Sequence, residues 1–152
     1  MYRKTLKTIR YMKSSEFSIG NYVNFFGYSV IIGLSKDAMT VENLDNGEIH
    51  EVAYNYLHLD SIRLTAWVLG ACGFDKRIDK DGKDSYVYES TGVRYTVKFM
   101  DERDGGYPLT YIDNIHEEQI NSPVPVPYLH NLQNVITATL GRELKFDINY
   151  EG

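Results

Sequence analysis

The sequence predicts an α+β protein that is rich in β-structure. The chain has 13 tyrosines in 152 residues, and aromatic side chains are enriched in strands. Short apolar runs are separated by turn residues such as glycine and asparagine. Apolar residues recur at helical spacing in two main stretches, residues 64–73 and 128–140.

Composition fits one domain or two small ones with a substantial core. Hydrophobic residues make up 43% of the chain, as in an ordinary globular protein. Cys72 is the single cysteine, so no disulfide can form within the chain. A secretory signal pattern and an apolar run of about 20 residues are both missing. We therefore expect a cytoplasmic protein without a membrane span.

Residues 1–16 read as a basic leader. It has five cations against Glu16, a net charge of +4, whereas the remainder carries −9. The spacing of Tyr2, Leu6, Ile9 and Met12 fits an amphipathic helix, and a flexible arm is the alternative. The leader either stays solvated or contacts phosphate, lipid headgroups or an acidic partner. Its cations are Arg3, Lys4, Lys7, Arg10 and Lys13.

Residues 17–63 read as a series of five short strands. The Asn46-Gly47 pair predicts a hairpin, because such a turn needs positive φ angles. Tight turns with glycine at the bends are typical of a small SH3-like barrel. The predicted strands are 19–26, 28–34, 39–44, 48–53 and 59–63, with one helical turn at 56–57.

Residues 64–152 read as a second region with one short helix, a sheet and a C-terminal helix. Thr65 suits the N-cap of the first helix, and Cys72 in its last turn is expected to be a buried packing residue. The charged stretch 75–84 is expected to be a loop with a hairpin turn at Asp81-Gly82, because it lacks the ligand spacing of a calcium loop. Predicted strands follow at 86–89, 93–100, 109–112, 115–120 and 144–150, with an extended segment at 122–127.

The stretch 119–141 carries no Asp, Glu, Lys or Arg in a chain that is 24% charged. Pro127 suits its first helical position and Gly141 the left-handed residue past its end. One side of this helix is apolar, and the other is polar but uncharged, which lowers the cost of desolvation. We therefore expect both sides to be covered, the polar side by another element, a second chain or a ligand. The candidate interface comprises Tyr128, His130, Gln133, Asn134 and Thr137.

No catalytic motif, metal-binding pattern or cofactor loop is found in the sequence. An enzyme that uses His130 is an alternative, and it requires a pocket with a carboxylate or nucleophile beside the imidazole. A second alternative is nucleic-acid binding, which the acidic body disfavours. In that case the leader would contact phosphate, and the stacking groups would be Tyr22, Phe25, Phe26 and Tyr28.

Three segments together resemble a family of short uncharacterised proteins of bacterial genomes and prophages. They are IGNYV at 19–23, LTAWVLGACGF at 64–74, and YLHNLQN at 128–134 followed by LGREL at 140–144. The resemblance covers most of residues 15–146 and implies a phage-linked accessory role in a bacterial cell. It implies no catalytic residues.

These observations predict a non-enzymatic binding or assembly protein that acts through protein contacts, most simply as a homo-oligomer. An alternative is a phage protein that sequesters a host protein or a small nucleotide ligand. No metal or cofactor is expected.

Overall fold

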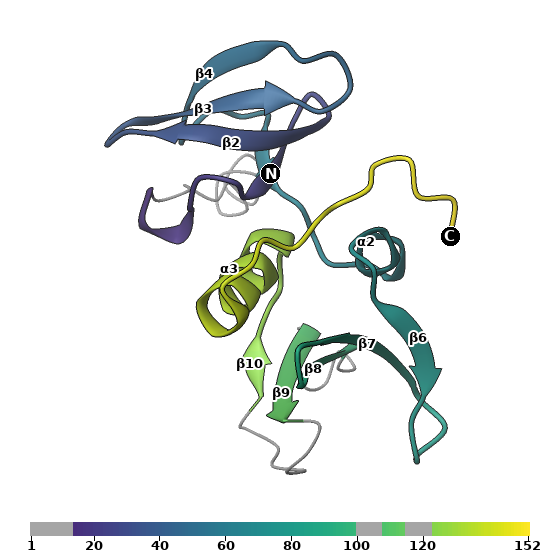
Figure 1. Cartoon of the computed structure of the whole chain (residues 1–152). Coiled ribbons are helices and arrows are strands. Elements are labelled where there is room, and N and C mark those ends of the chain that lie inside the picture. Colours follow the sequence, from purple (N-terminus) through teal and green to yellow (C-terminus); the bar gives the residue numbers. More distant parts are fainter. Residues whose placement is uncertain (1–13, 100–107, 115–122) are drawn as a thin grey trace, which may run out of the picture. The chain divides into compact units, whose positions relative to one another are not determined.

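The computed structural model describes residues 14–99, 108–114 and 123–152. The chain divides into two compact units, Met1–Ile62 and Arg63–Gly152. Among the described residues, each unit contains one five-stranded antiparallel sheet, and the second also contains two α-helices, α2 (Ala66–Ala71) and α3 (Leu129–Leu140) (Figure 1). The predicted β-rich α+β class is therefore confirmed. Neither sheet is closed, so the finer prediction of an SH3-like barrel is not confirmed.

The first unit has the strand order β4-β3-β2-β1-β5. Its strands lie where the apolar runs predict them, but β1 begins later than expected. Gly20 has a φ of 95° and forms a turn with Ile19, so the extended backbone starts only after it. The elements are a short 3-10 helix η1 (Ser14–Glu16), β1 (Tyr22–Phe25), β2 (Tyr28–Leu34), β3 (Ala38–Asn43), β4 (Ile49–Ala53) and β5 (Leu59–Ser61).

The hairpin between β3 and β4 contains the Asn46-Gly47 pair, as predicted. Of these two residues only Gly47 has a positive φ, 75°, so the turn is not the two-residue type. Asn43 shapes the longer loop, because its side-chain oxygen accepts hydrogen bonds from the backbone N–H groups of Asp45 and Asn46.

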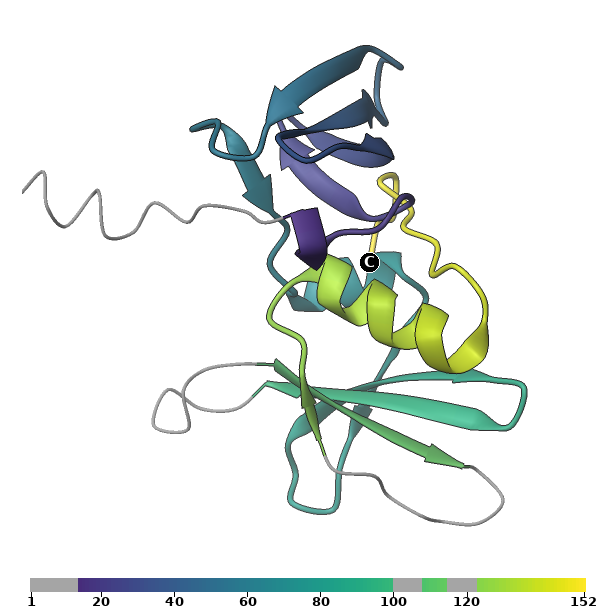
Figure 2. The ribbon, with the colours of Figure 1, turned by 90° about the vertical axis from the view of Figure 1, so that its left-hand side faces the viewer.

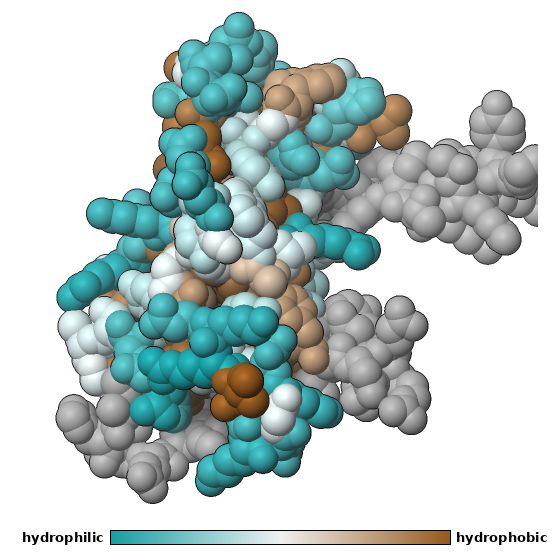
Figure 3. All heavy atoms as spheres, turned by 90° about the vertical axis from the view of Figure 1, so that its right-hand side faces the viewer, coloured by the Kyte–Doolittle hydropathy of each residue, from teal (hydrophilic) through white to brown (hydrophobic). Residues whose placement is uncertain are grey.

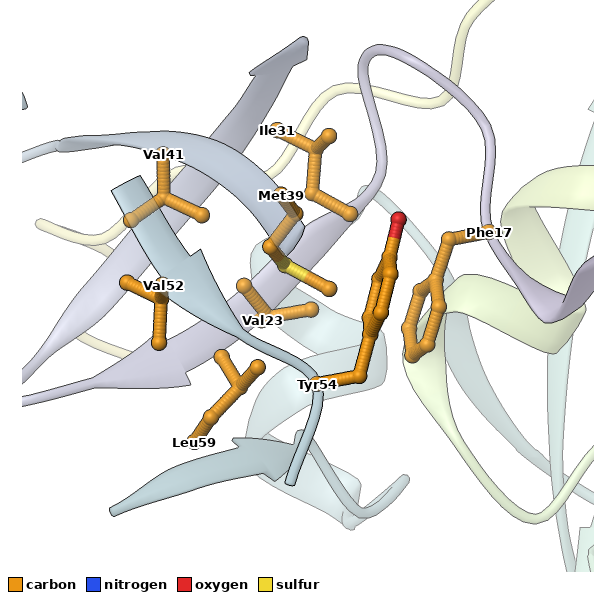
Figure 4. Packing of buried hydrophobic residues seen from close by; sticks show 8 residues of the cluster. All are labelled: Phe17, Val23, Ile31, Met39, Val41, Val52, Tyr54 and Leu59. Atoms are coloured by element: carbon orange, nitrogen blue, oxygen red, sulfur yellow. The ribbon is translucent and has the colours of Figure 1, made fainter. Parts of the chain in front are cut away.

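The core of the first unit lies on the concave side of its sheet. Side chains from β1 to β5 point toward one another, and the rings of Phe17 and Tyr54 lie next to each other (Figure 4). Each fully buried aliphatic side chain contributes roughly 1.5–3 kcal/mol relative to leaving it exposed. The members are Phe17, Val23, Ile31, Met39, Val41, Val52, Tyr54 and Leu59.

The sheet of the second unit is a meander of order β10-β9-β8-β7-β6. Its strands are β6 (Asp75–Ile78), β7 (Asp84–Ser90), β8 (Val93–Phe99), β9 (Pro108–Asn114) and β10 (Val124–Pro125). The predicted strand 115–120 lies outside the described residues.

The structure corrects the prediction that residues 75–84 form only a loop. Residues 75–78 are the edge strand β6, which pairs with β7, and all four are exposed. An edge strand with both faces wet needs no apolar alternation, and charges there discourage pairing with other chains. The hairpin at Asp81-Gly82 is confirmed, with Gly82 at a φ of 76°.

On the face drawn in Figure 3, hydrophilic residues predominate and hydrophobic ones occur in small groups.

Helix α2 spans Ala66–Ala71, and its N-cap is Thr65, as predicted. The Thr65 hydroxyl accepts a hydrogen bond from the backbone N–H of Val68 at 3.2 Å. Cys72 is the C-cap residue and is buried, also as predicted. Burial raises the pKa of its thiol from 9.0 to about 12.

Helix α3 spans Leu129–Leu140 and lies across the second sheet (Figure 2). The hydroxyls of Tyr95 on β8 and Thr139 on α3 are 2.6 Å apart. The helix ends at Gly141 in the left-handed conformation, as predicted. Its N-cap is Tyr128, so Pro127 lies before the helix and not in its first turn. The Asn131 side chain fixes this start by accepting the Tyr128 backbone N–H at 3.1 Å.

The C-terminal segment 144–150 is not a strand, contrary to prediction. Its burial still alternates, with Leu144 and Phe146 buried and Lys145 and Asp147 exposed. The segment bonds to the α2 region instead of a sheet, because Asp147 donates its backbone N–H to the carbonyl of Ala71. The indole of Trp67 also donates to the Tyr150 carbonyl at 3.2 Å.

Candidate functional site

Five rings of the first unit form a cluster at the molecular surface, which we call the aromatic patch. Six ring pairs within it have centroid distances from 4.9 Å (Phe25–Phe26) to 6.5 Å (Phe26–Tyr56). All six pairs are edge-on or tilted, an arrangement that aromatic rings prefer over a flat sandwich. The patch consists of Phe25, Phe26, His50, Tyr56 and His58.

Curvature of the sheet brings these rings together. Phe25 lies on β1 and His50 on β4, with β2 and β3 between them. A flat sheet would hold strands in these positions about 14 Å apart, yet the two ring centroids are 5.5 Å apart. The connection between β4 and β5 then adds Tyr56 and His58, and the turn after β1 adds Phe26.

Phe26 occupies a position that neither burial nor local conformation favours. Its φ is +50°, a region that bulky side chains rarely enter. Its side chain is 67% exposed, so strain here is not offset by burial. Asn24 holds the turn in shape, since its side-chain oxygen accepts the backbone N–H of Gly27 at 3.0 Å. Strain of this kind clusters at binding and active sites.

The rim of the patch is apolar and acidic. Leu57, which lies between the patch residues Tyr56 and His58 in the sequence, is 66% exposed. Glu48 Oε2 lies 3.3 Å from His50 Nε2. Residues 14–62 carry seven acidic side chains against Lys36, a net charge of −6. The surface therefore combines exposed rings with a negative field, which attracts cations and repels phosphates.

The residues of the predicted α3 interface are unequally accessible. His130 and Gln133 are 0% and 4% exposed. The His130 ring stacks on that of Tyr128 at 5.7 Å with an interplanar angle of 7°. Asn134 and Tyr128 are half-buried. Thr137 is exposed, and its hydroxyl donates to the Arg142 carbonyl at 3.3 Å. The polar side of α3 is thus buried near its start and open near its end.

Full burial leaves the His130 imidazole with no exposed edge for a substrate. A general base must come within hydrogen-bond reach of the proton that it removes. The geometry around His130 therefore gives no support to the enzyme alternative.

The nucleic-acid alternative is only partly represented among the described residues. Phe25 and Phe26 belong to the aromatic patch, and Tyr22 and Tyr28 are half-buried on the same hairpin. The proposed phosphate contacts Arg3, Lys4, Lys7 and Arg10 lie outside the described residues.

Sequence reasoning missed three of the five patch residues, His50, Tyr56 and His58. A usable signal was present in the run Tyr56-Leu57-His58. An aromatic and apolar run in a connection between strands is unusual where polar residues normally face water. The contact of His50 with Phe25 joins strands that are not neighbours, so it could not be found from local spacing.

A hollow of about 290 Å³ lies within the second unit. It is lined by four aromatic rings and the cation Lys76, which pairs with Asp84 at 3.5 Å. Tyr150 of the C-terminal segment forms part of its wall. The aromatic residues are Trp67, Phe74, Tyr86 and Tyr150.

Within the part of the chain that the structure describes, no three His, Cys, Asp or Glu side chains are grouped as a metal site requires. No helix among these residues is long and apolar enough to cross a bilayer. Comparison of the chain with protein-family models, curated proteins and solved structures gave no match.

Proposed function

We propose that the chain is a non-enzymatic binding protein whose aromatic patch holds a basic and apolar segment of a protein partner. The observation that carries this proposal is Phe26, an exposed ring held at a φ of +50° among four other rings. Large rigid rings supply much of the binding energy in protein interfaces.

Charge selects the class of partner. Lys and Arg side chains bind the faces of aromatic rings, for about 0.5–1 kcal/mol at an exposed site. The net charge of −6 on residues 14–62 adds long-range attraction for such a segment. Nucleic acid has exposed bases that could stack on the same rings, but its phosphates would meet this negative field. A basic protein segment is therefore the favoured ligand.

The order β4-β3-β2-β1-β5 and the shared concave core support a relation of residues 17–63 to SH3-like barrels. This relation and the phage-linked context remain part of the proposal. Binding at the patch requires neither, because it uses only the rings and charges of this chain.

The test is binding of a fluorescein-labelled basic probe peptide, with Arg and Lys interleaved with Leu and Tyr, to the full-length chain by anisotropy. The double variant Phe26→Ala/Tyr56→Ala should bind about tenfold more weakly or worse, since truncating a central aromatic residue typically costs over about 1 kcal/mol. Ile78→Ala is the matched control, because Ile78 is a 73% exposed apolar residue of the second unit. Its affinity should equal that of the natural chain.

Two comparison ligands identify the partner class. A peptide with every Arg and Lys replaced by Glu, and a single-stranded oligothymidylate, should both bind far more weakly than the basic peptide. Equal affinity for all three ligands would refute the proposal. So would an affinity for the basic peptide that is unchanged in the double variant Phe26→Ala/Tyr56→Ala.

A further inference from the structure

We infer that the resting occupant of the aromatic patch is the chain's own basic N-terminal segment, residues 1–13. This inference rests on the proposed function, because it assumes that the patch takes a basic segment. It adds that the chain carries a competitor for its partner.

The charges of the two parts are complementary. Residues 1–13 contain five cations and no acidic side chain, whereas residues 14–62 contain seven acidic side chains and Lys36. Opposite charges on two parts of one chain attract each other most strongly at low salt.

The apolar content of the segment also fits a cluster of rings. Residues 1–13 interleave their cations with six large apolar or aromatic side chains, which are Met1, Tyr2, Leu6, Ile9, Tyr11 and Met12. Exposed rings can take both kinds of side chain, the cations on their faces and the apolar groups between them.

The segment is long enough to reach the patch of its own unit. Thirteen residues span at most about 45 Å when extended and about 20 Å as a helix. A unit of about 50 residues has a radius of gyration of roughly 10 Å, so its diameter is near 25 Å. A chain tethered at Ser14 can therefore reach any face of the first unit.

Tethering makes even a weak contact effective. A short flexible connection gives an effective concentration in the millimolar range. If the free segment binds with a Kd of about 0.1 mM, an effective concentration of about 1 mM weakens the apparent affinity for an external peptide about tenfold. A partner would then have to displace the segment before binding.

The experiment uses the full-length chain and the same labelled basic peptide. The leader variant replaces the five cations of residues 1–13 by Gln. The matched control replaces five exposed cations elsewhere by Gln and has the same net charge. These are Lys36, Lys80, Lys83, Arg142 and Lys145.

The leader variant should bind the peptide about tenfold more tightly than the natural chain, while the control stays within about twofold. Adding Phe26→Ala should abolish the gain. Equal affinity of the natural chain and the leader variant would overturn the inference, and the proposed function would survive if Phe26→Ala still weakens binding. Absence of peptide binding in every chain would overturn both. A dimer in light scattering that is lost only in the leader variant would move the segment to a second copy and overturn the intramolecular form.

Discussion

Substitution of Phe26 should have opposite effects on the stability of the chain and on peptide binding. A left-handed conformation costs an ordinary residue roughly 1–2 kcal/mol, whereas Asn tolerates it. Phe26→Asn is therefore expected to keep or raise the free energy of unfolding, by up to about 1 kcal/mol, while weakening peptide binding several-fold. Urea denaturation followed by circular dichroism measures the first effect and anisotropy the second. A large loss of stability would show that the ring is needed for the fold. It would contradict the claim that Phe26 is held in a strained conformation for binding.

Cys72 makes the second unit sensitive to alkaline pH. Burial raises the pKa of its thiol from 9.0 to about 12. Between these values the unfolded chain loses the proton and the folded chain keeps it, so stability is full below pH 9 and falls as pH rises. The slope is at most about 1.4 kcal/mol per pH unit.

Comparison of the natural chain with Cys72→Ala separates the contribution of this thiol to the pH dependence of stability from that of the tyrosines and lysines, which titrate in the same pH range. Unfolding is followed by fluorescence of Trp67, the single tryptophan. The free energy of unfolding of the natural chain, relative to that of Cys72→Ala, should fall from pH 9 to pH 12. A difference that stays constant over that range would contradict the assigned pKa.

The burial of single residues on α3 could be predicted from the sequence only in part. The uncharged side of α3 was expected to be covered, and His130 and Gln133 are indeed buried. Spacing identified these residues as a group, but it could not show that burial changes along the helix from His130 to the exposed Thr137. That gradient depends on tertiary packing.

At the level of elements, α2 and the C-terminal segment depend on one glycine. A Cβ atom on Gly70 would lie 2.6 Å from the ring of Tyr150. Alanine normally stabilises a helix by about 1 kcal/mol relative to glycine. Here we expect Gly70→Ala to destabilise the second unit by about 1–3 kcal/mol, because the ring must move. Urea denaturation measures the change.

The double variant Gly70→Ala/Tyr150→Ala provides the control. Removing the ring removes the clash, so alanine at position 70 should then be neutral or stabilising relative to Tyr150→Ala alone. Strictly additive effects of the two substitutions would mean that Gly70 and Tyr150 do not interact in this way.

Most elements could be predicted from the sequence, because apolar alternation and turn residues act locally. The failures have a common cause. Strand β6 has no apolar side, and residues 144–150 have an apolar side but no strand to pair with. Alternation of apolar and polar residues indicates that one side of an extended chain is buried. It does not show which segment, if any, the backbone of that chain pairs with. The aromatic patch was also missed in part, since it joins β1, β4 and the segment after β4.

For the whole molecule, the central feature is the separation of charge along the sequence. All the charged side chains of residues 1–13 are Lys or Arg, whereas residues 14–62 have a net charge of −6. Salt screens such attraction over about 10 Å at 0.1 M. Affinity for the basic peptide should therefore fall steadily from 50 to 500 mM NaCl in the leader variant, and less steeply in the natural chain, where salt also weakens the competing contact of residues 1–13. Salt-independent affinity in the leader variant would show that charge does not contribute and that only the apolar contacts of the patch bind the peptide.

The most direct test of the account is nuclear magnetic resonance mapping of the basic peptide on the isotopically labelled full-length chain. We predict that the largest shifts occur at Phe25, Phe26, His50, Tyr56 and His58, and that resonances of α3 change little. Shifts concentrated at Asn134 and Thr137, with the patch unaffected, would contradict the account and return the binding surface to the C-terminal helix.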